Sequence, residues 1–158
     1  MRMVNTVLVR EVNIIDYIPL QLSAEELCPS ADYYLIQKGD SSLLELIFSE
    51  EDHLIHRITL VICSNYSRLD EVYQMPHNYH VGDIYVDSSV ESEVSTFTCY
   101  MYKNAIMIRV SDLPGFQTIR SGNVIWELSS QGDLISLCVT SMSPEAVMHC
   151  YDELSNAE

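Results

Sequence analysis

Two apolar runs with a two-residue period lie between Ser41 and Asn65, separated by a short acidic break. In the first run every second residue from Leu44 to Phe48 is apolar, and the same spacing recurs from Ile58 to Ile62. A period of two is typical of strands with one buried face, because successive side chains point to opposite sides. The pattern predicts an antiparallel hairpin that places Leu44–Phe48 and Ile58–Ile62 against the core.

A second hairpin is predicted from Asn123–Leu128 and Leu134–Val139, joined by a turn at Ser129–Asp133. This turn contains Gly132, and glycine readily adopts the positive φ that tight hairpins often need. Both hairpins run strand, acidic turn, strand, so an internal duplication stays open.

Shorter elements fill the rest of the chain. A third hairpin joins Thr96–Tyr102 to Ala105–Val110, and single strands are predicted at Val4–Val9, Ala31–Gln37 and Asp83–Asp87. A one-turn helix capped by Ser23 is predicted to end at Pro29. Residues 66–85 form a long irregular loop, with a short helix at Arg68–Gln74.

A C-terminal helix is predicted from Pro144 to about Leu154, because Ser143 is a preferred cap and proline is favoured at the first helical position. Apolar residues then recur at helical spacing. About nine strands and one helix predict a β-rich α+β fold, a mostly antiparallel curved sheet or sandwich of hairpins with a C-terminal helix. A length of 158 residues predicts a single domain over residues 1–158.

Net charge restricts the class of partner. The chain has 23 acidic and 8 basic residues, a net charge of −15. Such a field repels phosphate, which argues against direct binding to nucleic acid or to anionic membranes. It attracts a basic protein or a cation, and it exceeds the net charge of about 8 that is ample for solubility in a small domain.

The cysteines and the N-terminus indicate a compartment. Five cysteines are scattered without a C-x-x-C pair, at Cys28, Cys63, Cys99, Cys138 and Cys150. Unclustered cysteines in odd number are typical of reduced thiols. The first residues lack the apolar core of a signal peptide, and no apolar run reaches the ~20 residues that span a bilayer. We therefore expect a cytoplasmic protein.

Candidate catalytic and metal-binding residues are few. His77 and His80 have a metal-ligand spacing but supply only half of a tetrahedral zinc site. His53 and His56 flank the acidic turn, where a histidine could act as a general base, yet no nucleophile or phosphate-binding motif accompanies them. We expect no catalytic residue, no metal site and no cofactor.

Acidic and tyrosine residues gather in the middle of the chain and suit a protein interface, because aromatic rings anchor a partner and carboxylates pair with its Arg or Lys. The candidate partner-binding residues are Glu50, Glu51, Asp52, Tyr79, Asp83, Tyr85, Asp87, Glu91 and Glu93. The alternative, half-buried tyrosines over a β core with a solvated acidic rim, stays open.

In being small, acidic, β-rich and without catalytic motifs, the chain resembles bacterial immunity proteins of contact-dependent or polymorphic toxin systems. The resemblance implies a protein that binds a cognate toxin domain, often a basic nuclease, and blocks its active site or a nearby surface. A shorter segment, Gly122–Leu137, is similar to the closing hairpin of a small bacterial domain of unknown function, but Cys138 stands where that domain has an acidic residue.

Two other functions stay open. The first is a phage- or plasmid-encoded inhibitor of a nucleic-acid-binding enzyme, such as an anti-CRISPR protein or a nucleic-acid mimic, which would use the same acidic surface. The second is a small-molecule-binding or enzymatic β domain, in which the loop Tyr66–Tyr85 is a lid and His77 or His80 lines a pocket. The oligomeric state stays open as well.

Overall fold

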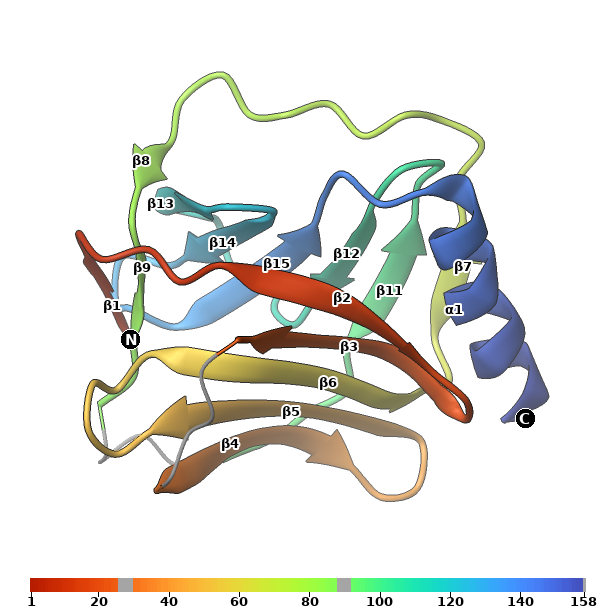
Figure 1. Ribbon diagram of the computed structural model, residues 1–158, viewed down its shortest axis with the longest axis horizontal. Coiled ribbons are helices and arrows are strands. Elements are labelled where there is room, and N and C mark those ends of the chain that lie inside the picture. Colours follow the sequence, from red (N-terminus) through yellow and green to blue (C-terminus); the bar gives the residue numbers. More distant parts are fainter. Residues whose placement is uncertain (26–29, 88–91, 158) are drawn as a thin grey trace.

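A computed structural model describes residues 1–25, 30–87 and 92–157 and shows two large β-sheets around one main core (Figure 1). The C-terminal helix lies across one end of the sheets, on the right of Figure 1. The predicted class, β-rich α+β with hairpins and a C-terminal helix, is confirmed.

The first sheet has six strands in the order β10-β4-β5-β6-β3-β2. Its strands are β2 (Arg10–Ile15), β3 (Ile18–Ala24), β4 (Ala31–Lys38), β5 (Ser42–Ser49), β6 (Ile55–Cys63) and β10 (Glu93–Val94). All neighbours are antiparallel except β10 and β4, which are parallel.

The second sheet has seven strands in the order β7-β11-β12-β15-β14-β13-β8. Its strands are β7 (Tyr66–Arg68), β8 (His80–Val81), β11 (Thr98–Met101), β12 (Ile106–Arg109), β13 (Gln117–Ser121), β14 (Val124–Leu128) and β15 (Leu134–Val139). A small separate sheet pairs β1 (Arg2–Val4) with β9 (Asp83–Tyr85), near the N-terminus in Figure 1.

The hairpin predicted between Ser41 and Asn65 is confirmed as β5 and β6, with Leu44, Leu46 and Phe48 buried. The predicted inward position of Ile62 is wrong. The register shifts by one residue between the pairs Leu43–Ile62 and Leu44–Leu60, and such a bulge moves the following side chains to the opposite face. As a result Cys63 is buried instead of Ile62.

The other two hairpins and the helix are also confirmed. Strand β14 pairs with β15, and β11 pairs with β12. Gly132 has φ +81° in its turn. Helix α1 (Pro144–Asn156) begins at the cap Ser143, whose side chain accepts a hydrogen bond from the Ala146 N–H. Its buried side chains, Val147, Cys150 and Leu154, join the main core.

Several predicted elements near the N-terminus are wrong. Residues 5–9 form no strand, and the Leu8 N–H donates to the Asp83 carboxylate instead of to a neighbouring strand. Ser23 does not cap a helix, because β3 continues to Ala24 and pairs with β2 and β6. The predicted helix end at Pro29 lies outside the described residues.

The predicted helix Arg68–Gln74 does not form. The irregular loop predicted over residues 66–85 is confirmed only for residues 69–79, because its ends form β7, β8 and β9. This segment runs from β7 to β8 along the top of Figure 1. Tyr73 packs against Tyr102, with ring centroids 5.2 Å apart, and its N–H donates to Asn104 Oδ1 over 2.9 Å. It helps to bury Ile125 and Cys138 on the outer face of the seven-stranded sheet, so β15 is buried on both faces. The segment is part of the packed fold.

Candidate functional site

Asp83 is fully buried, so its predicted role in surface binding is wrong. Its Oδ1 accepts a hydrogen bond from Arg10 Nη2 over 2.8 Å, and both side chains have 0% exposure. The hydroxyl of Ser121 donates to Oδ2 over 2.6 Å, and the Leu8 N–H donates to the same oxygen over 2.9 Å. The Ile84 N–H donates to Oδ1. The carboxylate therefore ties β2, β9 and β13 together inside the protein.

Arg10 completes this buried network from the six-stranded sheet. Its Nε donates to the Ile55 carbonyl over 2.9 Å and its Nη1 donates to Ser121 Oγ over 3.1 Å. The guanidinium also lies 5.6 Å from the centre of the Trp126 ring. A buried charge needs such partners, because an unpaired one carries a large desolvation cost.

Glu50, Glu51 and Asp52 lie exposed on the turn between β5 and β6, next to Tyr85. The His53 ring, in the same turn, stacks on the Tyr85 ring with centroids 4.8 Å apart. Asp87 is exposed two residues after Tyr85. The structure therefore brings five of the predicted residues to one end of the six-stranded sheet.

Two of these carboxylates already have partners within the chain. Glu50 accepts a hydrogen bond from Ser30 Oγ, and Asp52 lies 3.0 Å from Nε2 of the buried His56. A histidine–carboxylate pair is one part of an acid–base site. Asp52 Oδ1 also accepts a hydrogen bond from the Leu54 N–H over 2.9 Å, which holds the carboxylate within the turn.

Glu93 and Tyr79 lie elsewhere. Glu93, on the edge strand β10, accepts a hydrogen bond from the Tyr34 hydroxyl over 3.2 Å. Burial, followed by the negative charge of Glu93, raises the pKa of Tyr34 above its ordinary value. Tyr79 lies at the end of the 69–79 segment, where its hydroxyl accepts a hydrogen bond from Arg120 Nη1 over 3.1 Å. Glu91 lies outside the described residues.

Tyr79 lines an open polar pocket of about 600 Å³ together with His77 and His80, the two histidines with a metal-ligand spacing. Its lining residues are His77, Asn78, Tyr79, His80, Phe116, Gln117 and Thr118. The histidine rings and the Tyr79 hydroxyl give this pocket hydrogen-bonding groups for a polar ligand. In the described ranges, no group of three or more His, Cys, Asp or Glu side chains could hold a metal ion.

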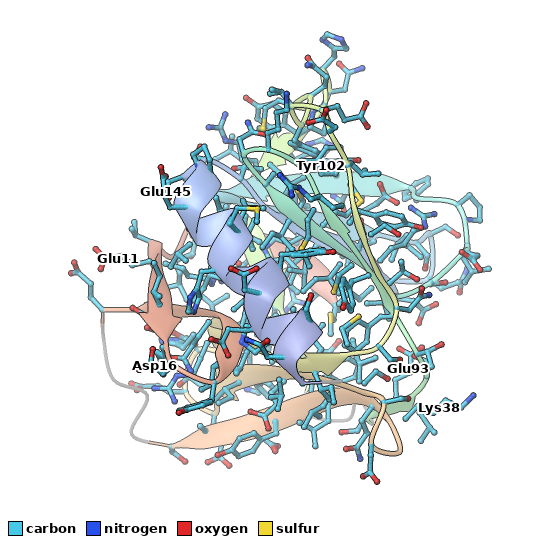
Figure 2. All side chains as sticks on the ribbon, turned by 90° about the vertical axis from the view of Figure 1, so that its right-hand side faces the viewer. Glu11, Asp16, Lys38, Glu93, Tyr102 and Glu145 are labelled. Carbon is cyan, nitrogen blue, oxygen red and sulfur yellow. The ribbon has the colours of Figure 1, made fainter. Side chains whose placement is uncertain are left out.

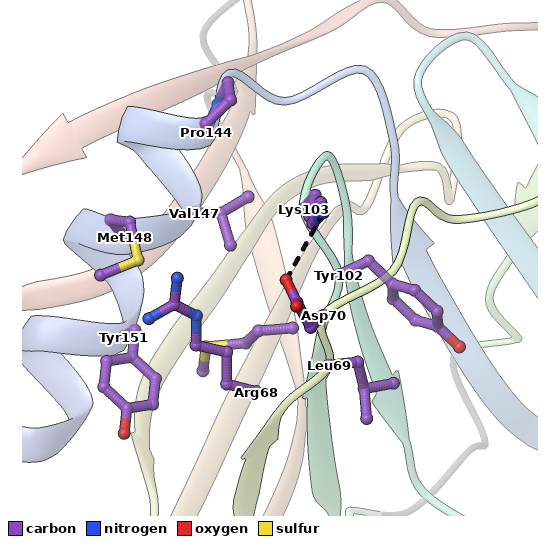
Figure 3. A pocket seen from close by; sticks show the side chains of 10 residues that line it. Arg68, Leu69, Asp70, Tyr102, Lys103, Pro144, Val147, Met148 and Tyr151 are labelled. Atoms are coloured by element: carbon purple, nitrogen blue, oxygen red, sulfur yellow. Dashed lines mark ion pairs between the residues drawn. The ribbon is translucent and has the colours of Figure 1, made fainter.

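A smaller cavity of about 140 Å³ lies between α1 and the β7 and β11 strands (Figure 3). Apolar side chains of Met101, Val147, Met148 and Tyr151 line it. The ion pair of Lys103 and Asp70, 3.5 Å long, also lines it and is largely exposed. This cavity contains none of the residues predicted from the sequence.

The four described cysteines, Cys63, Cys99, Cys138 and Cys150, are buried and form no disulfide with one another. Burial raises the pKa of Cys138 and of Cys150 to about 12, which keeps these two thiols protonated and unreactive at neutral pH. Cys28 lies outside the described residues.

Sequence reasoning overlooked the second face of β4 and β5. Apolar residues there, among them Leu35, Leu43 and Ile47, are only half-buried. The signal that reveals them is the continuous run Leu43-Leu44 and Leu46-Ile47-Phe48, which is apolar on both faces of one strand.

A comparison with protein-family models finds no match to this chain, and a comparison with curated proteins finds none either. Among the described residues, no helix is both long enough and apolar enough to cross a membrane.

Proposed function

We propose that this protein is an immunity protein that binds a cognate bacterial toxin domain in the cytoplasm and neutralises it. The partner is a basic protein, of nuclease type, held by acidic protein–protein contacts. The observation that carries the proposal is where the charge lies. Asp83 is the only carboxylate in the described ranges that is buried, so the remaining excess of acidic groups lies on the surface.

The basic side chains do little to offset this surface charge. Arg10 is buried against Asp83, and Lys103 forms an exposed pair with Asp70. Figure 2 shows Glu11 and Glu145 on the left-hand side of the view, and both are exposed. An acidic surface of this kind steers a basic partner into contact and raises its association rate. Carboxylates can also occupy the positions that phosphates take in a nuclease site.

The proposal is tested by capture on the immobilised protein from a lysate of its native host, at low and high salt, followed by mass spectrometry. We expect one basic protein that is retained at low salt and released at high salt, because screening weakens contacts between exposed charges. Its identity separates a toxin domain from a nucleic-acid-binding enzyme of the host. An empty eluate from a host that expresses candidate partners would contradict the proposal.

A second candidate function is small-molecule binding or catalysis in the pocket that contains His77 and His80. The observation in its favour is that a polar pocket collects both histidines with Tyr79. Tyr73 anchors the 69–79 segment on the sheet. We therefore propose this second function without a mobile lid over the pocket. The double variant His77→Ala/His80→Ala tests it, because ligand binding or turnover would be lost while capture of a basic protein would persist.

A further inference from the structure

The outer faces of the two large sheets differ in how they are covered. On the seven-stranded sheet, Tyr73 of the 69–79 segment covers part of the outer face, where Ile125 and Cys138 are at most 4% exposed. On the six-stranded sheet, Tyr33 is 55% exposed, and Leu35, Leu43 and Ile47 are half-buried. Strands β4 and β5 form the lower boundary of the molecule in Figures 1 and 2. Among the described residues, one sheet face is partly covered by its own chain, and the other is open.

The open face carries apolar side chains on three neighbouring strands, β4, β5 and β6. Because side chains alternate along a strand, burial of Tyr34 and Ile36 directs Tyr33 and Leu35 outward. The strand register then places Tyr33 opposite Ile47, and Leu43 opposite Ile62. We call this set the outer apolar patch: Tyr33, Leu35, Leu43, Ile47 and Ile62. The bulge in β6 adds Ile62 to the patch.

Carboxylates lie within the patch and at its ends. Glu45 is opposite Leu35 on one side and Thr59 on the other, at the middle of the face. Residues 38–63 contribute five carboxylates and two Lys or Arg side chains. The carboxylates are Asp40, Glu45, Glu50, Glu51 and Asp52, and the basic residues are Lys38 and Arg57. Apart from Glu45 and Arg57, the charged residues lie at the ends of the strands around the apolar ones, as the polar rim lies around the apolar core of a protein interface.

We infer that the outer apolar patch and its acidic rim are the docking surface for a basic protein. This inference rests on the proposed function and says which face of the protein binds. The patch lies on β4, β5 and β6, and three strands of up to nine residues span about 14 Å by about 27 Å, or roughly 390 Å². This is about half of the ~800 Å² that each partner buries in a stable complex, and the acidic turns at the strand ends extend the surface beyond it. A second copy of this chain fits poorly, because each copy carries a net charge of −15.

The test compares Leu35→Lys with the matched control Phe116→Lys. Both variants replace an apolar residue by lysine, and Phe116 is 77% exposed beside the histidine pocket. Lysine at position 35 lies opposite Glu45, and an opposite-charge pair across strands favours folding. A cooperative urea unfolding transition is the check that both variants fold. The probe is the basic protein that the wild-type chain captures, purified and titrated by calorimetry against all three proteins.

We expect Leu35→Lys to weaken binding by at least about 30-fold, since charge repulsion and loss of an apolar contact act together at an interface centre. Phe116→Lys should change binding by less than about threefold. The inference would be overturned if Leu35→Lys bound the basic protein as tightly as the wild type, or if Phe116→Lys alone lost binding. Either result would leave the proposed function standing. Failure of the wild type to capture any basic protein would overturn the proposed function, and the assignment of this face with it. Sedimentation that shows a dimer lost in Leu35→Lys would assign the face to a second copy.

Discussion

Replacement of Asp83 by alanine is expected to destabilise the fold severely, although this residue lies outside every candidate surface. The change removes a carboxylate that accepts hydrogen bonds from Arg10, Ser121, Leu8 and Ile84. It leaves the Arg10 guanidinium inside the protein, where its side chain has 0% exposure. Among the residues that the structure describes, the Ile55 carbonyl and the Ser121 hydroxyl remain as its hydrogen-bond acceptors.

The magnitude follows from this unpaired charge. Removal of one partner from a buried ion pair costs about 3–5 kcal/mol. We therefore expect Asp83→Ala to lower the free energy of unfolding by about 4 kcal/mol, a large part of the ~5–15 kcal/mol that a domain has. Asp83→Asn keeps the volume and one acceptor oxygen, so it should cost about half as much. The double variant Arg10→Leu/Asp83→Leu leaves no buried charge and should be more stable than Asp83→Ala.

Urea unfolding can be followed by the fluorescence of Trp126, the only tryptophan, which is fully buried beside Arg10. With a slope near ~2 kcal/mol per molar urea, the midpoint of Asp83→Ala should fall by about 2 M. Lys103→Ala is the control, because it removes an exposed ion pair worth less than about 1 kcal/mol. An Asp83→Ala midpoint within about 0.3 M of the wild type would refute the reasoning.

Three further predictions concern the buried thiols, alkaline pH and the helix cap. Because Cys63, Cys99, Cys138 and Cys150 are all buried, a Cys28→Ser variant should react with a thiol reagent at neutral pH only after unfolding; rapid labelling of the native protein would contradict this. Burial raises the pKa of Tyr73, so above about pH 9 the unfolded chain holds fewer protons than the folded one. The free energy of unfolding therefore falls as pH rises. Urea midpoints at pH 8 and 10.5 test this, and a higher midpoint at pH 10.5 would contradict it. Ser143→Ala removes the cap of α1 and should cost about 1 kcal/mol, whereas Ser143→Asp should cost little; equal melting curves of the two variants would argue against the cap.

The hairpins and the helix could be predicted because their signals are local. A two-residue period, a turn glycine such as Gly132 and a cap such as Ser143 act within a few residues of the chain. Strand β13 gave no such signal, since Ile119 is its only apolar residue. Strands β7 and β8 are held by parallel pairing with β11 and β13, which are distant in sequence. Such tertiary pairing leaves no local pattern.

The candidate site was harder to predict for the same reason. Asp83 has the composition of a surface acid, and its burial depends on Arg10, 73 positions away. Glu50 belongs to an acidic turn that the sequence shows, but the approach of Tyr85 to this turn depends on a bridge between Leu54 and Tyr85. The outer apolar patch requires the strand register and the bulge at Ile62. These features follow from how the sheets pair, so a single sequence does not reveal them.

The most direct test of the central claim is growth of bacteria that express the captured basic protein, with and without this chain. The account predicts that the captured protein alone stops growth, that co-expression of the wild-type chain restores it, and that the Leu35→Lys variant restores it poorly at equal expression. A captured protein that does not impair growth, or whose toxicity is unchanged by the wild-type chain, would contradict the assignment as an immunity protein.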